Sequence, residues 1–203
     1  MEKKKIICVL GESKSGKDNT VGIAELISKE MGDEILLNEV VSYTTRPKRE
    51  NEENGREHFF ISEEKAKKMM QEKKILAYTK IEDPNSGVKG YEYFTTYEQL
   101  EGANIYIIDP NGLESLRKHP NLDILSVYIH SPKFIRKIRA MKFSDYNKEY
   151  KNRVKNEERQ FAKFKKNKEY DYKIHNIQWF SYITGKRFYN LCHAFLTDKL
   201  KKR

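Results

Sequence analysis

Short apolar runs alternate along most of the chain with longer segments in which apolar residues recur at helical spacing. This alternation is typical of a parallel sheet covered by helices on both faces, so the sequence predicts an α/β fold. The apolar runs predict strands at Ile6–Leu10, Ile35–Ser42, Asn104–Asp109, Ile124–His130 and Tyr172–His175. The periodic segments predict helices at Asp18–Met31, Glu63–Lys73, Leu113–Lys118, Pro132–Met141, Lys148–Phe164 and Ile177–Lys201.

The stretch from Tyr43 to Leu100 breaks the alternation. It is rich in Tyr, Thr, Glu and Gly, with short β-like runs at His58–Ile61 and Ile75–Ile81. We interpret this stretch as a lobe inserted into one domain, because 203 residues suffice for a single core with small additions. The predicted division is a core of residues 1–42, 101–132 and 165–203, an inserted lobe of 43–100 and a helical lid of 133–164.

The last predicted helix carries an apolar face typical of a helix packed on a core. Gly185 lies within it and is predicted to mark a break. Cys192 also falls in this helix and Cys8 in the first strand, so their spacing suggests neither a disulfide framework nor a zinc site.

One loop carries the clearest functional signal. It connects the first predicted strand to the first predicted helix. Glycines let such a backbone turn until successive N–H groups point at one anion, and the helix N-terminus adds partial positive charge. A lysine in the position of Lys17 reaches the terminal phosphates of a nucleoside triphosphate. We interpret the loop as an ATP-binding P-loop rather than an ordinary glycine-rich turn. Its residues are Gly11, Glu12, Ser13, Lys14, Ser15, Gly16, Lys17 and Asp18.

The residue after Lys17 departs from the usual P-loop pattern. Ser or Thr, whose hydroxyl binds Mg²⁺, is usual there, and this chain has Asp18. A carboxylate is also a hard oxygen ligand, so we expect Mg²⁺ with Asp18 as a ligand, directly or through water. An acidic first-turn residue that favours the helix dipole explains Asp18 equally well. The nearby Thr20 is expected to point elsewhere.

Positive charge is concentrated in the second half of the chain. Lys and Arg number 40 against 30 Asp and Glu, and residues 133–169 carry 14 Lys and Arg against five Asp and Glu. Such a block suits a nucleic-acid surface, a lid over a polyphosphate or a solvated helix face. Because a P-loop lies upstream and no nucleic-acid motif is present, we assign the arginines to a lid and most lysines to solvent. We expect no nucleic-acid partner.

No apolar run reaches membrane-spanning length, so no membrane partner is expected. The basic N-terminus followed by Ile6–Leu10 looks like a signal peptide, but its apolar part is too short and the P-loop follows at once. We therefore expect a cytoplasmic protein. The sequence gives no oligomeric state.

A second candidate anion site lies in the inserted lobe. Arg46 and Arg49 flank Pro47 on one short segment, close to Ser42. Two guanidinium groups at this spacing can form a bidentate phosphate clamp, although for the pair alone surface arginines in a charged loop would be the default interpretation. A P-loop for a donor and a separate clamp for an acceptor phosphate is what phosphoryl transfer between nucleotides requires.

The segment Ser42–Ser62 resembles the acceptor-phosphate segment of the guanylate kinase family, S-x-T-T-R-x-x-R-x-x-E-x-x-G-x-x-Y-x-F, without a gap. Weaker matches at Tyr91–Thr95, Tyr106–Gly112 and Tyr172–Asn176 extend the resemblance from Ile6 to about Asn176. The resemblance implies a P-loop NTPase-type parallel sheet flanked by helices, with an inserted mixed-β lobe that binds a monophosphate and a helical lid.

The resemblance also implies site residues. The acceptor phosphate would contact Ser42, Arg46, Arg49 and Tyr93, with Glu52 beside them, and the base would contact Thr95 and Asp109. Arg136, Arg139 and Arg153 fall in the lid region, where Arg139 and Arg153 would neutralise the transferring phosphate. Asn176 would lie near the adenine of ATP.

Four positions depart from the family pattern. His58 replaces the tyrosine before the aromatic strand and would still donate a hydrogen bond to the acceptor phosphate, and Phe94 replaces a glycine. Ile107 replaces the first Asp of the D-x-D strand end, and Ala77 stands where a glutamate usually reads the guanine edge. Guanine needs acceptors for its N1–H and N2–H₂ donors, and Asp109 is the best remaining candidate.

The resemblance implies an ATP- and Mg²⁺-dependent kinase of GMP or dGMP, with Lys17, Arg46, Arg139 and Arg153 as catalytic residues. Two alternatives stay open. In the first alternative, the acceptor is another small phosphorylated molecule, an interpretation that Asp18 and the altered base positions favour. In the second alternative, the chain is a binding domain without catalytic activity, an interpretation that the presence of Lys17 disfavours.

Overall fold

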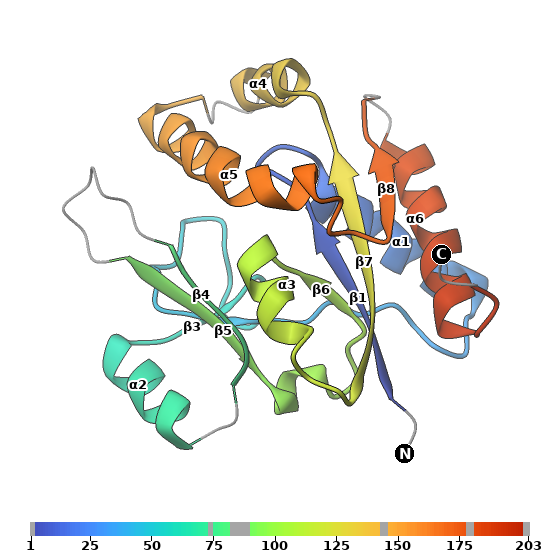
Figure 1. Ribbon diagram of the computed structural model, residues 1–203, viewed down its shortest axis with the longest axis horizontal. Helices are drawn as coiled ribbons and strands as arrows, with labels where there is room; N and C mark the ends of the chain where they lie inside the picture. Colours follow the sequence, from blue (N-terminus) through green and yellow to red (C-terminus); the bar gives the residue numbers. More distant parts are fainter. Residues whose placement is uncertain (1–2, 73–74, 82–89, 143–145, 178–180, 201–203) are drawn as a thin grey trace.

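The structure is a computed structural model, described here for residues 3–72, 75–81, 90–142, 146–177 and 181–200. Its central sheet has four parallel strands in the order β6-β1-β7-β8 (Figure 1). The inner strands β1 and β7 are mostly apolar and mostly buried, as expected of strands covered on both faces. The strands are β1 (Lys4–Leu10), β6 (Ile105–Ile107), β7 (Leu122–His130) and β8 (Tyr172–His175).

Helices cover both faces of this sheet. One core layer joins β1, β6 and β7 to α1 and α6, through residues such as Val21 and Phe188. The opposite layer joins the sheet to α3 and α5, through residues such as Leu113 and Phe164. The predicted parallel sheet with helices on both faces is confirmed. The helices are α1 (Lys17–Met31), α3 (Pro110–Leu116), α4 (Lys133–Lys142), α5 (Lys148–Lys166) and α6 (Ser181–Leu196).

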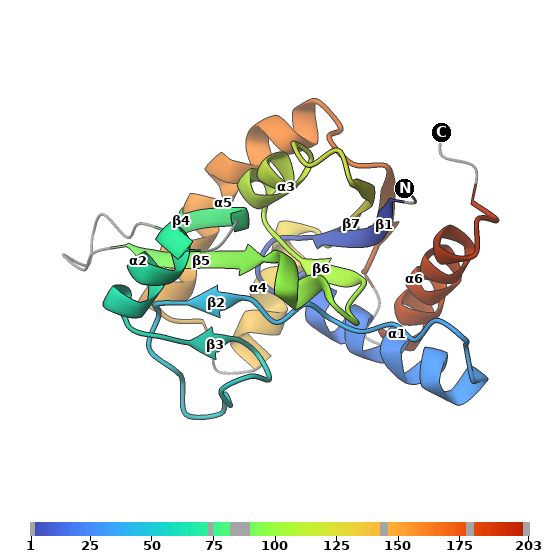
Figure 2. The same ribbon diagram turned by 90° about the horizontal axis from the view of Figure 1, so that it is seen from below.

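A second, mixed sheet lies beside the first, on the side away from α6 (Figure 2). Its order is β3-β2-β5-β4, with β2 and β3 parallel and the other pairs antiparallel. Helix α2 packs on it through Ala66 and Met69, which contact Phe94. The division into core, lobe and lid stays a prediction. The elements are β2 (Tyr43–Thr44), β3 (Phe59–Phe60), α2 (Glu63–Glu72), β4 (Ile75–Ile81), β5 (Tyr91–Thr96) and a 3₁₀ turn at Tyr97–Leu100.

The predicted strand Ile35–Ser42 is wrong. This segment makes only an isolated bridge, from Glu39 to Ile105 at the edge of the central sheet. The side chain of Asn104 accepts a hydrogen bond from Asn38 N (3.1 Å) and donates one to Leu36 O (2.8 Å). These side-chain bonds use backbone groups that a strand ladder would need, so the segment crosses the edge as a loop.

Several predicted boundaries also move. The helix predicted from Leu113 begins at Pro110, because the Asp109 carboxylate caps it by accepting Gly112 N at 2.8 Å. The last helix ends at Leu196 rather than near Lys201. Strand β5 was not among the strands that the apolar runs predicted. Lys73 and Lys201, predicted helix ends, lie outside the described residues. Within the described part of the chain, no helix is long and apolar enough to cross a membrane.

Gly185 does not break the last helix, as the sequence predicted. It lies inside α6 where that helix meets α1, and a Cβ there would lie 2.3 Å from Ile23 Cγ2. The glycine therefore permits close helix packing beneath the P-loop helix.

Gly185→Ala is expected to destabilise the fold by about 1–3 kcal/mol, because the added methyl group meets Ile23 in a packed interface. Gly22→Ala is the matched control, since no atom lies within 4 Å of a Cβ at that helical position. It should stabilise by about 0.5–1 kcal/mol. Urea denaturation measures both, and equal effects of the two substitutions would contradict the packing explanation.

Candidate active site

The predicted P-loop connects β1 to α1, as expected. Its turn depends on Gly16, which adopts a left-handed conformation with φ 86° immediately before the helix. A Cβ at Gly16 would lie 2.4 Å from Nδ2 of Asn176, so only glycine fits this close approach. The loop therefore needs both the conformational freedom and the small size of this residue.

Two side chains hold the carbonyl groups of the P-loop. Asn176 donates to Ser15 O at 2.8 Å, and Arg139 donates through one nitrogen to Lys14 O (3.1 Å) and Ser15 O (3.0 Å). Arg139 also donates to Asn176 O at 3.0 Å. The structure thus brings both predicted residues to the loop, where they bind its backbone. Their expected contacts with adenine and with the transferring phosphate stay predictions.

Glu12 forms a buried ionic network in the P-loop. Its carboxylate lies 3.0 Å from Lys165 Nζ and 3.6 Å from Arg136, and it accepts a hydrogen bond from Tyr128 at 2.8 Å. Burial alone would raise the pKa of Glu12, but Arg136, Lys165 and Tyr128 hold it below its ordinary value. Glu12 is therefore an ionised group that joins α4, α5 and β7 to the loop.

Lys17 and Asp18 begin α1 at the open end of the loop. Lys17 Nζ lies 3.3 Å from an Asp18 oxygen. Asp18 is exposed, and although partial desolvation opposes ionisation, the Lys17 charge and hydrogen bonds hold the pKa of its carboxyl group below the ordinary value. Thr20 donates its hydroxyl to Gly16 O at 2.8 Å, away from this pair, as expected.

An ionised Asp18 fits the donor chemistry of Mg²⁺. Glu39 is exposed and its backbone N–H donates to Glu25 at 2.8 Å; partial desolvation, and then the negative charges of Asp18 and Glu25, raise the pKa of its carboxyl group to about 8. The described residues contain no group of three or more His, Cys, Asp or Glu side chains arranged around one ion. Phosphate oxygens and water would therefore have to complete the coordination of Mg²⁺.

The second sheet holds the predicted clamp. Arg46 donates to both oxygens of Glu52 (2.9 and 2.8 Å) and through Nε to Tyr93 Oη (3.1 Å). The Arg46 guanidinium lowers the pKa of Glu52 to about 2. Arg49 is exposed on the same loop, and its backbone N–H donates to Glu52 at 2.9 Å. This geometry preorganises the guanidinium group of Arg46 in one orientation.

His58 and Ser42 complete this cluster. Ser42 Oγ and His58 Nδ1 lie 2.9 Å apart, and the His58 ring lies edge-on to Tyr93 with ring centroids 5.6 Å apart. Burial, and then the positive charge of Arg46, lowers the pKa of His58. The structure therefore brings five predicted residues, Ser42, Arg46, Glu52, His58 and Tyr93, to one place, with Arg49 close enough to influence their charges.

Thr95 and Asp109, the predicted base contacts, lie where the two sheets meet. Thr95 is hydrogen-bonded to the hydroxyl of Tyr106, and Asp109 accepts from Thr79 Oγ1 at 3.1 Å. Burial raises the pKa of Asp109. Ala77 is paired with Thr95 across the strands and is only 2% exposed, so the position lies in this cluster without supplying a polar group.

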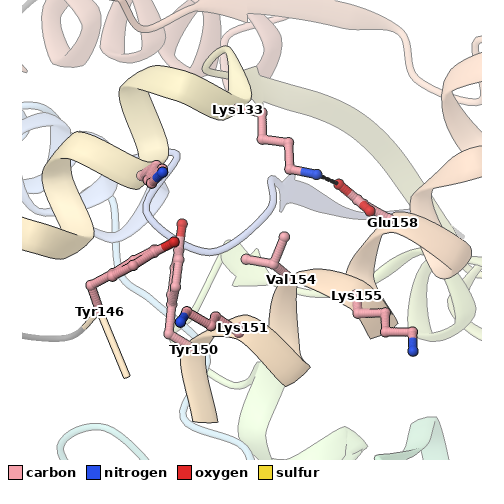
Figure 3. A pocket seen from close by; sticks show the side chains of 8 residues that line it. Lys133, Tyr146, Tyr150, Lys151, Val154, Lys155 and Glu158 are labelled. Carbon is pink, nitrogen blue, oxygen red and sulfur yellow. Dashed lines mark ion pairs between the residues drawn. The ribbon is translucent and has the colours of Figure 1, made fainter. Parts of the chain in front are cut away.

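Helices α4 and α5, the predicted lid, place their arginines differently. Arg136 is buried against Glu12 and donates to Ser131 O at 3.2 Å, whereas Arg153 lies on the exposed side of α5. A cavity of about 220 Å³ between α4 and α5 is lined by Lys133, Lys137, Lys151 and Lys155 with two tyrosines (Figure 3). All four lysines are exposed, and none of the predicted site residues lines this cavity.

Sequence reasoning missed several residues of the site. Glu157 accepts hydrogen bonds from the P-loop residue Ser13, Lys165 and Tyr128 bind Glu12, and Thr79 binds Asp109. For Thr79 a signal was present, since it lies two residues from Ala77 on the same strand. Glu157 and Lys165 lie more than a hundred residues from their partners and left no local pattern.

The fold and the side-chain arrangement together define a class, a P-loop protein whose second sheet carries an arginine held by a carboxylate and a tyrosine. The sequence profile of the guanylate kinase family matches residues 3–180. The chain therefore belongs to the guanylate kinase family.

Individual relatives are distant. Proteins named guanylate kinase from Hyphomonas neptunium, Rhodopseudomonas palustris and Thermotoga maritima are 27%, 29% and 28% identical to it over 120, 134 and 133 residues. These matches cover 59%, 65% and 65% of this chain and 53%, 57% and 60% of the relatives, so the chain spans less than two thirds of their length. The crystal structure of guanylate kinase from Anaplasma phagocytophilum superposes with a TM-score of 0.61 at 18% identity, covering 98% of this chain and 89% of that one. This last likeness shows the fold.

His58 is expected to titrate below its ordinary value of 6.5, because burial and the Arg46 charge both disfavour the imidazolium. A histidine NMR titration measures the midpoint. In Arg46→Ala the midpoint should move up towards 6.5, since one of the positive charges is removed. A wild-type midpoint at or above 6.5 would contradict the arrangement.

Proposed function

We propose that this protein transfers the terminal phosphoryl group of ATP to a nucleoside monophosphate, with GMP or dGMP as the best-supported acceptor. The observation that carries the proposal is the preorganised Arg46, held by Glu52 and Tyr93 in a chain of this family that also has a P-loop. Two separate anion sites suit a donor and an acceptor that both carry phosphate.

The P-loop would bind the donor. Its backbone N–H groups and Lys17 would contact the β- and γ-phosphates, and Arg139 and Asn176 keep the loop carbonyls turned towards the protein. Asp18 would hold Mg²⁺, which supplies charge compensation for the phosphates when it is bound. Lys17, released from its contact with Asp18, could then follow the developing charge.

The clamp of Arg46 and Arg49 would bind the acceptor phosphate and orient its oxygen for in-line attack. Ser42, Tyr93 and neutral His58 would add hydrogen bonds to the same phosphate, and Glu52 keeps the Arg46 fork in place. Arg153 would approach from α5 to neutralise charge, and lid closure would exclude water.

The base would lie at Thr95 and Asp109. Asp109 is the acidic group of this cluster, since Ala77 and Ile107 supply no acceptor. A second candidate acceptor, another small phosphorylated molecule, is favoured by these two apolar side chains, because a missing buried acceptor weakens discrimination between bases.

The proposal is tested by an acceptor panel, in which GMP, dGMP, AMP, CMP and UMP are each assayed as acceptors. ADP formation from ATP and Mg²⁺ should require GMP or dGMP and should be much slower with AMP, CMP and UMP. Lys17→Ala should reduce turnover by about a hundredfold or more, because it removes the positive charge that would stabilise the phosphoryl group during transfer. Turnover with none of the five, while ATP still binds, would reject nucleoside monophosphates as acceptors.

Arg46→Ala is expected to raise the KM of the acceptor by about 10- to 150-fold, the factor for a charged hydrogen bond of about 1.5–3 kcal/mol. Arg56→Ala is the matched control, because Arg56 lies on the same loop but is exposed and binds Glu53 and Glu57. Steady-state kinetics at saturating ATP measure both variants. An unchanged acceptor KM and kcat in Arg46→Ala would show that the clamp is assigned to the wrong residue.

A further inference from the structure

A carboxylate from the lid side of the molecule binds the P-loop directly. Glu157, in the middle of α5, accepts the backbone N–H of Ser13 at 2.8 Å and the Ser13 hydroxyl at 2.5 Å. Both donors of one P-loop residue are thus satisfied by one side chain that is 144 residues distant in sequence. Charge-assisted hydrogen bonds of this kind are about twice as strong as neutral ones.

The same helix binds the neighbouring P-loop residue with the opposite charge. Lys165 of α5 lies 3.0 Å from Glu12. The helix therefore contacts Ser13 through the carboxylate of Glu157 and contacts Glu12 through the ammonium group of Lys165. The two contacts lie eight residues apart, about two helical turns along α5. Together they fix where α5 lies along the loop and how it is rotated about its axis.

The geometry points to Glu157 as a positioning residue for ATP, an inference that rests on the proposed function of the P-loop. Its carboxylate holds the first half of the loop, Gly11 to Ser13. The following turn, closed by the hydrogen bond from Ser15 N to Glu12 O at 2.9 Å, then keeps the curvature that a phosphate chain needs. Ser13 then serves Glu157 and not the nucleotide, contrary to its expected place among the ATP contacts.

If Glu157 instead competed with ATP for the P-loop donors, its removal would change the ATP affinity in the opposite direction. A carboxylate on P-loop donors could compete with the terminal phosphate of ATP, and its removal would then tighten ATP binding. A positioning role predicts weaker binding instead. The sign of the change in ATP affinity therefore separates the two roles.

The experiment measures binding of a non-hydrolysable ATP analogue with Mg²⁺ by calorimetry, in the full chain without acceptor. Glu157→Ala should weaken binding about tenfold. Glu157→Gln should weaken it less, because the amide can still accept from Ser13 N and donate to its hydroxyl oxygen. Ser13→Ala should cost about threefold, and the double variant should be no weaker than Glu157→Ala alone, since both remove one shared contact.

Glu158→Ala is the matched control. Glu158 is the next residue of α5, but it binds Lys133 at 2.5 Å at the cavity between α4 and α5 (Figure 3). The affinity of the Glu158→Ala variant for the ATP analogue should stay within about twofold of wild type.

Unchanged or tighter binding in Glu157→Ala would overturn the inference, and so would additive losses in the double variant. If Glu157→Ala does not fold, Glu157→Gln and Ser13→Ala decide, and wild-type affinity in both overturns it. Because no acceptor is present, the result stands even if GMP is not phosphorylated. Failure of the proposed function would appear in the acceptor panel, with analogue binding intact.

Discussion

The arrangement of the site depends on one buried carboxylate. Glu12 lies inside the P-loop, is 2% exposed, and binds Arg136 of α4, Lys165 of α5 and Tyr128 of β7. Removing one partner of such a buried pair costs about 3–5 kcal/mol, because the remaining charge is left uncompensated. The shape of the loop and the placement of α4 and α5 therefore depend on the same ion-pair network. Arg139 and Asn176 extend this dependence to the loop carbonyls.

Local patterns predicted the parallel sheet and the P-loop, whereas features that depend on long-range contacts could not be predicted. Glycine, lysine and a following helix sufficed for the loop, and two arginines around Pro47 suggested a phosphate clamp, which stays a prediction. The strand expected at Ile35–Ser42 fails because Asn104, far away in sequence, binds its backbone. Gly185 looked like a helix break and instead lets α6 approach Ile23, which no local pattern could show.

The proposed sites for the acceptor phosphate and for the base differ in how much their side chains already bind one another. Arg46 is held by a carboxylate and a phenol, yet it lies on a partly exposed loop where a phosphate could reach it. At the junction of the sheets, Thr95 binds Tyr106, and Thr79 binds Asp109. A base entering there would have to share these hydrogen bonds. On our proposal, phosphate recognition follows the family, and base recognition is where this chain differs from it.

The most direct test of the two-site proposal uses one molecule that spans both sites. Adenosine and guanosine joined through five phosphates should bind once per chain with Mg²⁺, more tightly than an ATP analogue or GMP alone. Calorimetry on wild type, Lys17→Ala and Arg46→Ala decides the matter. The proposal predicts that each substitution weakens binding of the joined compound. Weakening by Lys17→Ala alone, with wild-type affinity in Arg46→Ala, would contradict it, because the second half of the compound would then not contact the clamp.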